Sequence, residues 1–156
     1  MTVLLVLIGI ILFLVSNGKY VAPNGDGKLR KCDSHGCGHF GAPRGNRDHM
    51  GLDFETTLGQ IIYAPTDCVV NRHGKVANDG RHDLIELVWK EGNDDFRCKI
   101  MYVYGMLPVN SLIRSGGVIA QADTLQDKYQ GITEHVHLEL IKNGQHVDPA
   151  PYFNTK

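Results

Sequence analysis

The strongest constraint on the fold is a succession of short β-type segments with no helical period between them. Apolar and β-branched residues gather in short runs at residues 61–64, 68–70, 84–89, 98–103, 118–120 and 134–141. Turn-forming residues separate these runs, for example at 78–80, 91–94 and 142–144. No window sustains the spacing of an amphipathic helix, and the best helical candidate is a short piece at 108–113. The pattern predicts an all-β protein, an antiparallel β sandwich or partly open barrel with long loops and little helix.

The first eighteen residues have the character of a targeting segment. Residues 3–15 form an apolar run interrupted only by Gly9, which is shorter than the roughly 20 residues of a membrane span. Small polar residues follow at 16–18, so we predict a signal peptide over residues 1–18 and a secreted, extracellular protein. The alternative is an uncleaved membrane anchor. No second apolar segment of this length follows, so we expect no stable membrane insertion after cleavage.

The remainder of the chain is predicted to contain one domain preceded by a loop region. Residues 19–46 are rich in Gly, Pro, Asn, Asp and basic side chains and are interpreted as an ordered loop region, whereas 47–156 form the β domain. The chain carries a net charge of -1, and the predicted signal contributes no charged side chain. This near-neutral balance argues against nucleic acid as a partner.

Four cysteines follow the signal, and an oxidising export route favours disulfides. Cys32 and Cys37 are near enough in sequence to close a small loop, which would leave Cys68 to pair with Cys98 and join two strands. An alternative makes Cys32, His35 and Cys37 zinc ligands, but a fourth ligand at structural-zinc spacing is missing.

Three histidines and one carboxylate form a candidate metal site. His135 and His137 lie two apart in a predicted strand, so both side chains share one face. His49 and Asp53 flank a glycine in loop-like surroundings, and a loop leading into a strand would bring both to the same ion. Imidazole and carboxylate suit zinc. The other histidines lie in turn-rich segments and are expected at the surface: His35, His39, His73, His82 and His146.

Several motifs occur together and in order. Residues 49–54 read His-Met-Gly-Leu-Asp-Phe, and 59–65, 113–120 and 135–149 follow, the last with a His-x-His and a Val-Asp-Pro. Over about residues 47–153 the chain resembles the lysostaphin-type zinc endopeptidases. The resemblance implies an antiparallel β core with a groove over one zinc ion. It also implies that His49, Asp53 and His137 hold the zinc, with His135 facing the reacting centre as a catalytic residue if the site is active.

A narrower resemblance involves the segment ahead of the histidine motif. Residues 32–38, Cys-Asp-Ser-His-Gly-Cys-Gly, resemble the leukocyte cell-derived chemotaxin-2 family, secreted vertebrate signalling proteins with the same fold. In that family this loop is a disulfide, which implies a Cys32–Cys37 bridge. The family's partner for the cysteine at Cys98, near residues 141–142, is absent here, and Cys68 has no counterpart. The second bridge is therefore predicted to join Cys68 and Cys98.

The resemblance to active endopeptidases is incomplete at one position. They carry a second histidine in a Tyr-x-His-Leu segment, where this chain has Tyr104, a candidate for the groove or for an oxyanion contact. No histidine occurs in residues 101–107. Because the loss of one such electrostatic stabiliser typically costs about 10²–10³ in rate, we expect weak peptidase activity or none.

Three functions remain open at the level of sequence. The first is a secreted zinc-binding signalling or innate-immune factor whose partner is a cell-surface receptor or an extracellular peptide or glycan. The second is a secreted zinc endopeptidase that cleaves Gly-rich peptides, for example those of bacterial cell walls. The third is an innate-immune protein that binds such peptides without cutting them.

Overall fold

A computed structural model describes residues 18–77 and 80–156. The predicted signal peptide therefore lies outside the described residues, apart from Gly18. Within the described ranges no helix is present, so none has the length and apolar character needed to cross a membrane. The described strands are β1 (Pro43–Arg44), β2 (Arg47–Asp48), β3 (Leu52–Glu55), β4 (Ile61–Tyr63), β5 (Cys68–Lys75), β6 (Asp83–Glu91), β7 (Asp94–Tyr104), β8 (Leu112–Ile113), β9 (Val118–Ala122), β10 (His135–Lys142) and β11 (Gln145–Val147).

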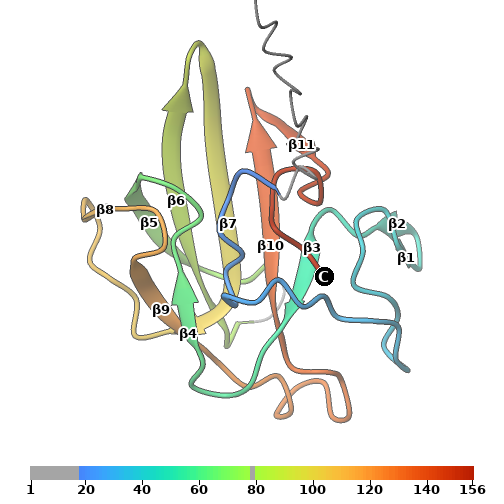
Figure 1. Cartoon of the computed structure of the whole chain (residues 1–156). Helices are drawn as coiled ribbons and strands as arrows, with labels where there is room; N and C mark the ends of the chain where they lie inside the picture. Colours follow the sequence, from blue (N-terminus) through green and yellow to red (C-terminus); the bar gives the residue numbers. More distant parts are fainter. Residues whose placement is uncertain (1–17, 78–79) are drawn as a thin grey trace, which may run out of the picture.

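The long strands β6, β7 and β10 run side by side through the main sheet, whose order is β11-β10-β7-β6-β5-β8 (Figure 1). All the pairings of this sheet are antiparallel. On the side of β10 away from β7, β3 pairs with the first half of β10 and β11 pairs with the second half. This arrangement places β3 and β10 next to each other in fixed register, which is what the metal site needs.

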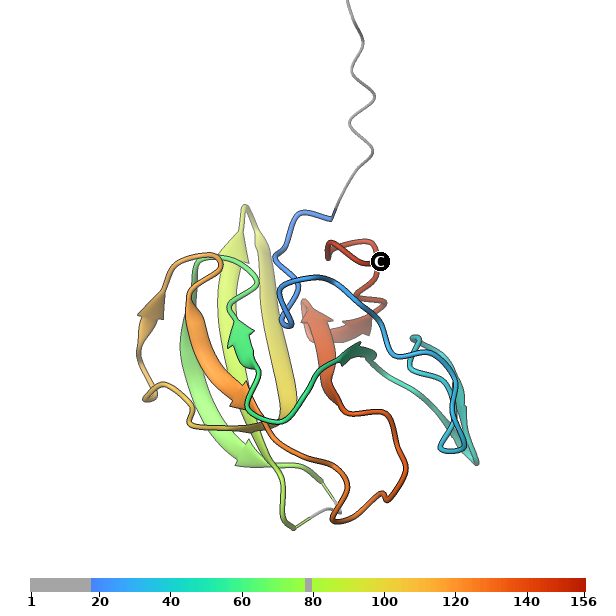
Figure 2. The same ribbon diagram turned by 60° about the horizontal axis from the view of Figure 1, so that its bottom comes forward.

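A second layer covers part of the main sheet. Strand β9 pairs with the end of β7 and then with β4, and Figure 2 shows β4 and β9 in front of the β5-β6-β7 surface. The hairpin β1-β2 projects on the other side of the molecule, beyond β3. The sheet does not close on itself. The predicted all-β, antiparallel and partly open architecture is confirmed.

The core lies on one face of the main sheet because the strand sequences alternate. On β10, Val136, Leu138 and Leu140 are fully buried, whereas the residues between them face the opposite side. Leu52 and Phe54 do the same on β3. Burial of each such side chain contributes about 1.5–3 kcal/mol. The opposite face of β3 and β10 is thus left for polar side chains.

The loop region before β3 packs against the domain. Tyr20 is buried among Trp89, Tyr152 and Phe153, with ring centroids 5.3 to 6.0 Å away. Its backbone forms a parallel bridge with Phe153. The predicted Cys32–Cys37 disulfide is present and closes a small loop in this region.

The predicted Cys68–Cys98 bridge is absent, and both cysteines are buried free thiols. The strand order explains the difference, because β6 lies between β5 and β7. Cysteines two strands apart in a sheet are separated by about 9.5 Å, whereas a disulfide requires Cα atoms within about 7 Å. Burial raises the pKa of Cys68 to about 11 and that of Cys98 well above its usual value.

One local expectation is also corrected, and β7 has an irregularity that the sequence patterns do not predict. Residues 108–113 are not helical: Asn110 takes a positive φ of 70° in a turn, and the chain then enters β8. Strand β7 contains a bulge at Tyr102, because the register with β6 skips this residue between Met101 and Val103. Tyr102 has a φ of 68°, which is a strained conformation for a large side chain.

Candidate metal centre

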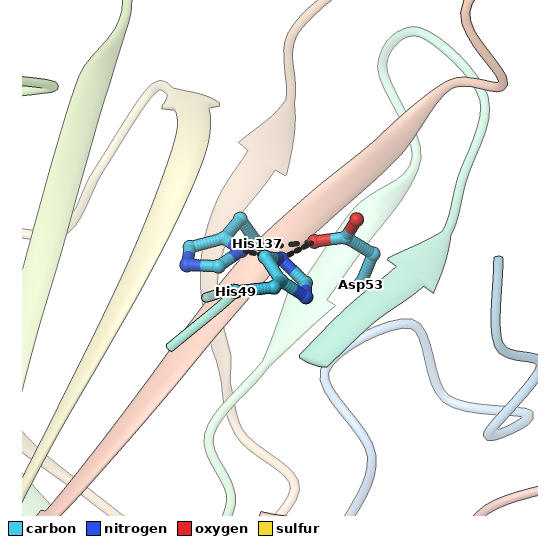
Figure 3. A group of neighbouring side chains, drawn as sticks. All are labelled: His49, Asp53 and His137. Atoms are coloured by element: carbon cyan, nitrogen blue, oxygen red, sulfur yellow. Dashed lines mark hydrogen bonds and ion pairs between the residues drawn. The ribbon is translucent and has the colours of Figure 1, made fainter. Parts of the chain in front are cut away.

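Two neighbouring strands and one loop bring the three predicted ligands together. His137 on β10 and Asp53 on β3 are direct partners across the strands, so their side chains share the face opposite the core. His49 lies in the loop just before β3 and reaches the same point (Figure 3). This is the loop-into-strand arrangement that the sequence suggested.

The geometry of the cluster fits a metal ion. The His49 Nε2 and His137 Nδ1 atoms are 2.9 Å apart, and they lie 3.1 and 2.9 Å from Asp53 Oδ1 (Figure 3). Ligands about 2.05 Å from a tetrahedral zinc are roughly 3.3 Å from one another. The three donors already converge to nearly this spacing, and together they form a group able to hold a metal.

Contacts behind the ligands orient them. The Nδ1 of His49 lies 2.7 Å from the carbonyl oxygen of His39, so it donates there and leaves Nε2 free for a metal. The Nε2 of His137 lies 3.7 Å from the Glu139 carboxylate. That carboxylate also contacts Lys99 and His146. A carboxylate behind a ligating imidazole is a common feature of protein metal sites.

Arg30 is a site residue that the sequence reasoning missed. Its Nη1 donates to Asp53 Oδ2 at 2.9 Å, and its other nitrogens bind Asp33. Arg30 is 4% exposed although it comes from the loop region. The sequence offers only a weak signal for this role, an arginine three residues before Asp33 at the edge of the cysteine loop.

The carboxylate of Asp53 and the imidazole of His137 shift each other's pKa. Burial would raise the pKa of Asp53, but hydrogen bonds from His137 and His49 outweigh it and hold this pKa well below its usual value. Burial would lower the pKa of His137, but its contacts with Asp53 and Glu139 raise it to about 9. The two shifts share one cause, the contact between Asp53 and His137.

Gly51 allows the closest approach of the loop to β10. A Cβ atom at this position would lie 2.4 Å from the carbonyl oxygen of Leu138 and 2.5 Å from Cε1 of His137. Any other residue would therefore collide with the strand and with a ligand. The glycine in the His-x-x-x-Asp motif is explained by this contact.

The fourth predicted residue, His135, lies beside the cluster and outside it. Its Nε2 is 3.6 Å from Asp53 Oδ2, and its Nδ1 is 2.6 Å from the carbonyl oxygen of Thr133. Burial lowers the pKa of His135. His135 thus lies next to the group of His49, Asp53 and His137 and is not a member of it.

Tyr104 lies away from the site, contrary to the sequence-based expectation. The pocket at the metal cluster has a volume of about 560 Å³, and Tyr102, not Tyr104, is the tyrosine of β7 that lines it. The Tyr102 ring packs edge-on against His135, with centroids 5.6 Å apart. The match of this part of the chain to the Tyr-x-His-Leu segment predicts Tyr104 at the site, whereas the tyrosine that reaches the pocket lies two residues earlier, at the bulge of β7.

The remaining histidines divide into three groups. His39 and His73 are exposed, as expected. His35 and His146 are also exposed, but they line the pocket. His82 was expected at the surface and is instead fully buried, 2.8 Å from the carbonyl oxygen of Thr124 and edge-on to Tyr102.

Known proteins are similar to this chain in sequence or in fold. Leukocyte cell-derived chemotaxin-2 of Mus musculus is 33% identical over 133 residues, which is 84% of this chain and 83% of the mouse protein. The catalytic domain of the antimicrobial peptidase lysostaphin from Staphylococcus simulans superimposes with a TM-score of 0.57 at 20% identity, over 74% of this chain and 87% of that domain. A zinc-containing peptidase from Vibrio cholerae gives a TM-score of 0.58 at 21% identity, over 89% of this chain and 40% of the peptidase. No family model matches the sequence.

The antiparallel fold with a His-Asp-His cluster defines the class as proteins with the lysostaphin-type peptidase fold. This chain spans two fifths of the Vibrio peptidase, so the likeness concerns only part of that protein. Within this class, the identity to the mouse protein over most of both chains is decisive. The protein belongs to the leukocyte cell-derived chemotaxin-2 family.

Proposed function

We propose that the protein is a secreted, zinc-binding factor of the chemotaxin type, which acts by binding a cell-surface receptor or an extracellular peptide or glycan. The complete His49-Asp53-His137 cluster in a chain of this family is the observation that carries the proposal. The disulfide of the loop region supports an extracellular location, because disulfides persist in oxidising compartments.

Zinc is the metal that suits the donor set. Two imidazole nitrogens and one carboxylate oxygen favour zinc over magnesium or calcium, which prefer oxygen ligands alone. One ion would be held, by His49, Asp53 and His137. Bound there, it would supply a Lewis acid with an open coordination position. In a signalling protein its main effect would be to stabilise the folded state and the loops around the pocket.

The residues for peptide cleavage form an incomplete set. His135 presents Nε2 toward the cluster and is suited to accept a proton. Strand β7 contains no histidine, and the aromatic ring that it contributes to the pocket belongs to Tyr102. A tyrosine hydroxyl donates a hydrogen bond to an oxyanion but carries no positive charge. The pocket is therefore better suited to binding than to rapid hydrolysis.

The pocket has the mixed character of a site for an extracellular peptide or glycan. Arg44 and Arg47 line one part of it, and Met50, Tyr129 and Ile132 line others. Basic groups beside exposed apolar and aromatic surface provide both orientation and contact area.

The alternative function is a zinc endopeptidase that acts on Gly-rich peptides, favoured by the position of His135 beside the cluster. One experiment separates the two. The zinc-loaded protein is incubated with a pentaglycine peptide and with bacterial cell walls, beside a His135→Ala variant. We expect no zinc-dependent cleavage above that of the variant. Cleavage that is abolished in His135→Ala would replace the proposed function with the peptidase, and binding of cell walls without cleavage would identify a wall peptide as the ligand.

Metal binding itself is tested separately. His49→Ala and Asp53→Ala should each lose the bound zinc, measured as zinc per protein after gel filtration. A variant that retains one full equivalent of zinc would contradict the ligand assignment.

A further inference from the structure

We propose that Arg30, together with the disulfide-closed loop that holds it, positions the metal ligands, so that the affinity for the metal depends on this loop. The loop is defined here as residues 30–39. The inference rests on the proposed zinc binding, and it assigns a role to residues that supply no ligand atom.

Arg30 connects the loop to a ligand through its side chain. Nη1 donates to Asp53 Oδ2 at 2.9 Å, while Nε and Nη2 donate to the two oxygens of Asp33 at 3.1 and 2.6 Å. Nη2 also reaches the carbonyl oxygen of Gly36 at 3.1 Å. The guanidinium is rigid and planar, so it fixes the distance and angle between the two carboxylates. With Oδ2 of Asp53 occupied by Arg30, the Oδ1 atom is directed at His49 and His137.

The backbone of the same loop clamps Asp53. The N–H of Arg30 donates to the carbonyl oxygen of Asp53, and the N–H of Asp53 donates to the carbonyl oxygen of Gly38, both at 2.9 Å. Between these two points the chain reverses at Asp33 and Gly36, which exchange a pair of backbone hydrogen bonds. The Cys32–Cys37 disulfide closes this reversal. The bridge therefore holds together the two ends of the clamp on Asp53.

The loop also contacts the other histidines of the site. The carbonyl oxygen of His39 accepts from Nδ1 of His49 at 2.7 Å. Asp33 Oδ2 accepts from the N–H of Thr133 at 2.9 Å, and the carbonyl oxygen of Thr133 lies 2.6 Å from Nδ1 of His135. One short segment thus orients a ligand imidazole, a ligand carboxylate and the histidine beside them. Arg30 and Asp53 are almost completely buried, with side chains 1% and 2% exposed, so little solvent competes with these contacts.

The charge of Arg30 and the geometry that its guanidinium imposes affect the metal site in different ways, and two variants test them. A positive guanidinium next to a cation site disfavours the cation, and the Asp33 carboxylate offsets this effect. Arg30→Lys keeps the charge and removes the planar fork, so it tests geometry alone. Asp33→Asn removes the negative charge that pairs with Arg30 and replaces one acceptor oxygen by an N–H2 donor. Both changes should weaken zinc binding, by about 10- to 100-fold, as for other groups that orient metal ligands.

The experiment compares zinc dissociation constants by competition with a chromophoric chelator. The variants are Arg30→Lys, Asp33→Asn and the double variant Cys32→Ser/Cys37→Ser. The double variant is preferable to chemical reduction because dithiol reductants themselves bind zinc. Lys31→Gln is the matched control, since Lys31 is an exposed basic residue of the same loop. Absorption spectra of the cobalt-substituted proteins report the ligand geometry, and melting temperatures of the metal-free proteins report folding.

We expect weaker zinc binding and an altered cobalt spectrum in all three variants, with Lys31→Gln like the wild type. Variants that melt like the wild type and bind zinc equally well would overturn the positioning role while leaving the proposed function intact. A lower melting temperature of the metal-free variants with unchanged zinc affinity and cobalt spectrum would also overturn it, because the loop would then be structural only. A wild-type protein that binds no zinc would overturn both proposals.

Discussion

The contact between Gly51 and β10 provides a direct test of how the site is built. Gly51 does not adopt a left-handed conformation, so alanine is compatible with its backbone. The added Cβ would meet Leu138 O at 2.4 Å and the His137 ring at 2.5 and 2.7 Å, whereas ordinary contacts are 3.4 Å or longer. The loop or the strand must therefore move by most of an ångström.

The size of the effect follows from this displacement. Overpacking of this kind costs about 1–3 kcal/mol, which lowers the melting temperature by about 3 °C per kcal/mol for a domain of this size. Metal sites tolerate deviations of only about 0.2 Å in ligand distances. We therefore expect Gly51→Ala to lose stability without metal and to bind zinc at least tenfold more weakly.

Thermal unfolding of the metal-free protein and zinc titration against a chelator measure the two effects. Gly45→Ala is the control, because Gly45 is exposed with a φ of 67°, and a Cβ added there would have no atom within 4 Å. Alanine there costs only the backbone strain of about 1–2 kcal/mol, so zinc affinity should stay unchanged. Wild-type zinc affinity in Gly51→Ala would refute the reasoning that this close approach sets the position of His137.

Three further predictions concern titration and thiols. Burial and the hydrogen bond to Glu91 raise the pKa of Tyr20, so the folded state favours the neutral phenol. The free energy of unfolding should therefore fall as the pH rises above about 10. Urea unfolding of Tyr20→Phe should lack this pH dependence. Burial would raise the pKa of Asp33, but the hydrogen bonds that its carboxylate accepts outweigh burial and lower this pKa. The carboxylate therefore stabilises the folded state above about pH 4, and this stabilisation is lost at lower pH. The difference in unfolding free energy between the wild type and Asp33→Asn should shrink below that pH. Cys68 and Cys98 should not react with a thiol reagent in the native protein, and two thiols should react after denaturation. A denatured, unreduced protein without free thiols would contradict the assignment of these two cysteines as unpaired.

The cluster of His49, Asp53 and His137 could be predicted from sequence because its members lie in two short local motifs. His135 and His137 share a face because alternation holds over this part of β10. His49 and Asp53 are four residues apart across a loop-to-strand transition, and the glycine between them signals close packing. The longer strands were predictable because their apolar runs are bounded by turn-forming residues, whereas the two-residue strands β1, β2 and β8 are too short to show an alternating pattern.

Other features depend on which strands are neighbours in the sheet, and local sequence patterns do not contain the strand order. Cys68 and Cys98 lie in segments that any β arrangement would bury, but only the order β5-β6-β7 shows that a strand separates them. Motif matching along β7 predicts Tyr104 at the site, whereas the structure places Tyr102, the residue at the bulge, in the pocket, and composition does not reveal this bulge. Arg30 was missed because loop composition predicts exposure, whereas its two carboxylate partners make burial favourable.

The bridge between Tyr20 and Phe153 has a consequence for the order of folding. Synthesis proceeds from the N-terminus, so Tyr20 emerges from the ribosome long before its partner exists. Until Phe153 and Tyr152 are synthesised, the ring of Tyr20 lacks two of its aromatic neighbours, although the backbone of Val21 can already bond to Pro65. The packing around Tyr20 should therefore be completed only after the C-terminal residues are available, and a nascent chain stalled before Phe153 should leave Tyr20 more exposed to solvent.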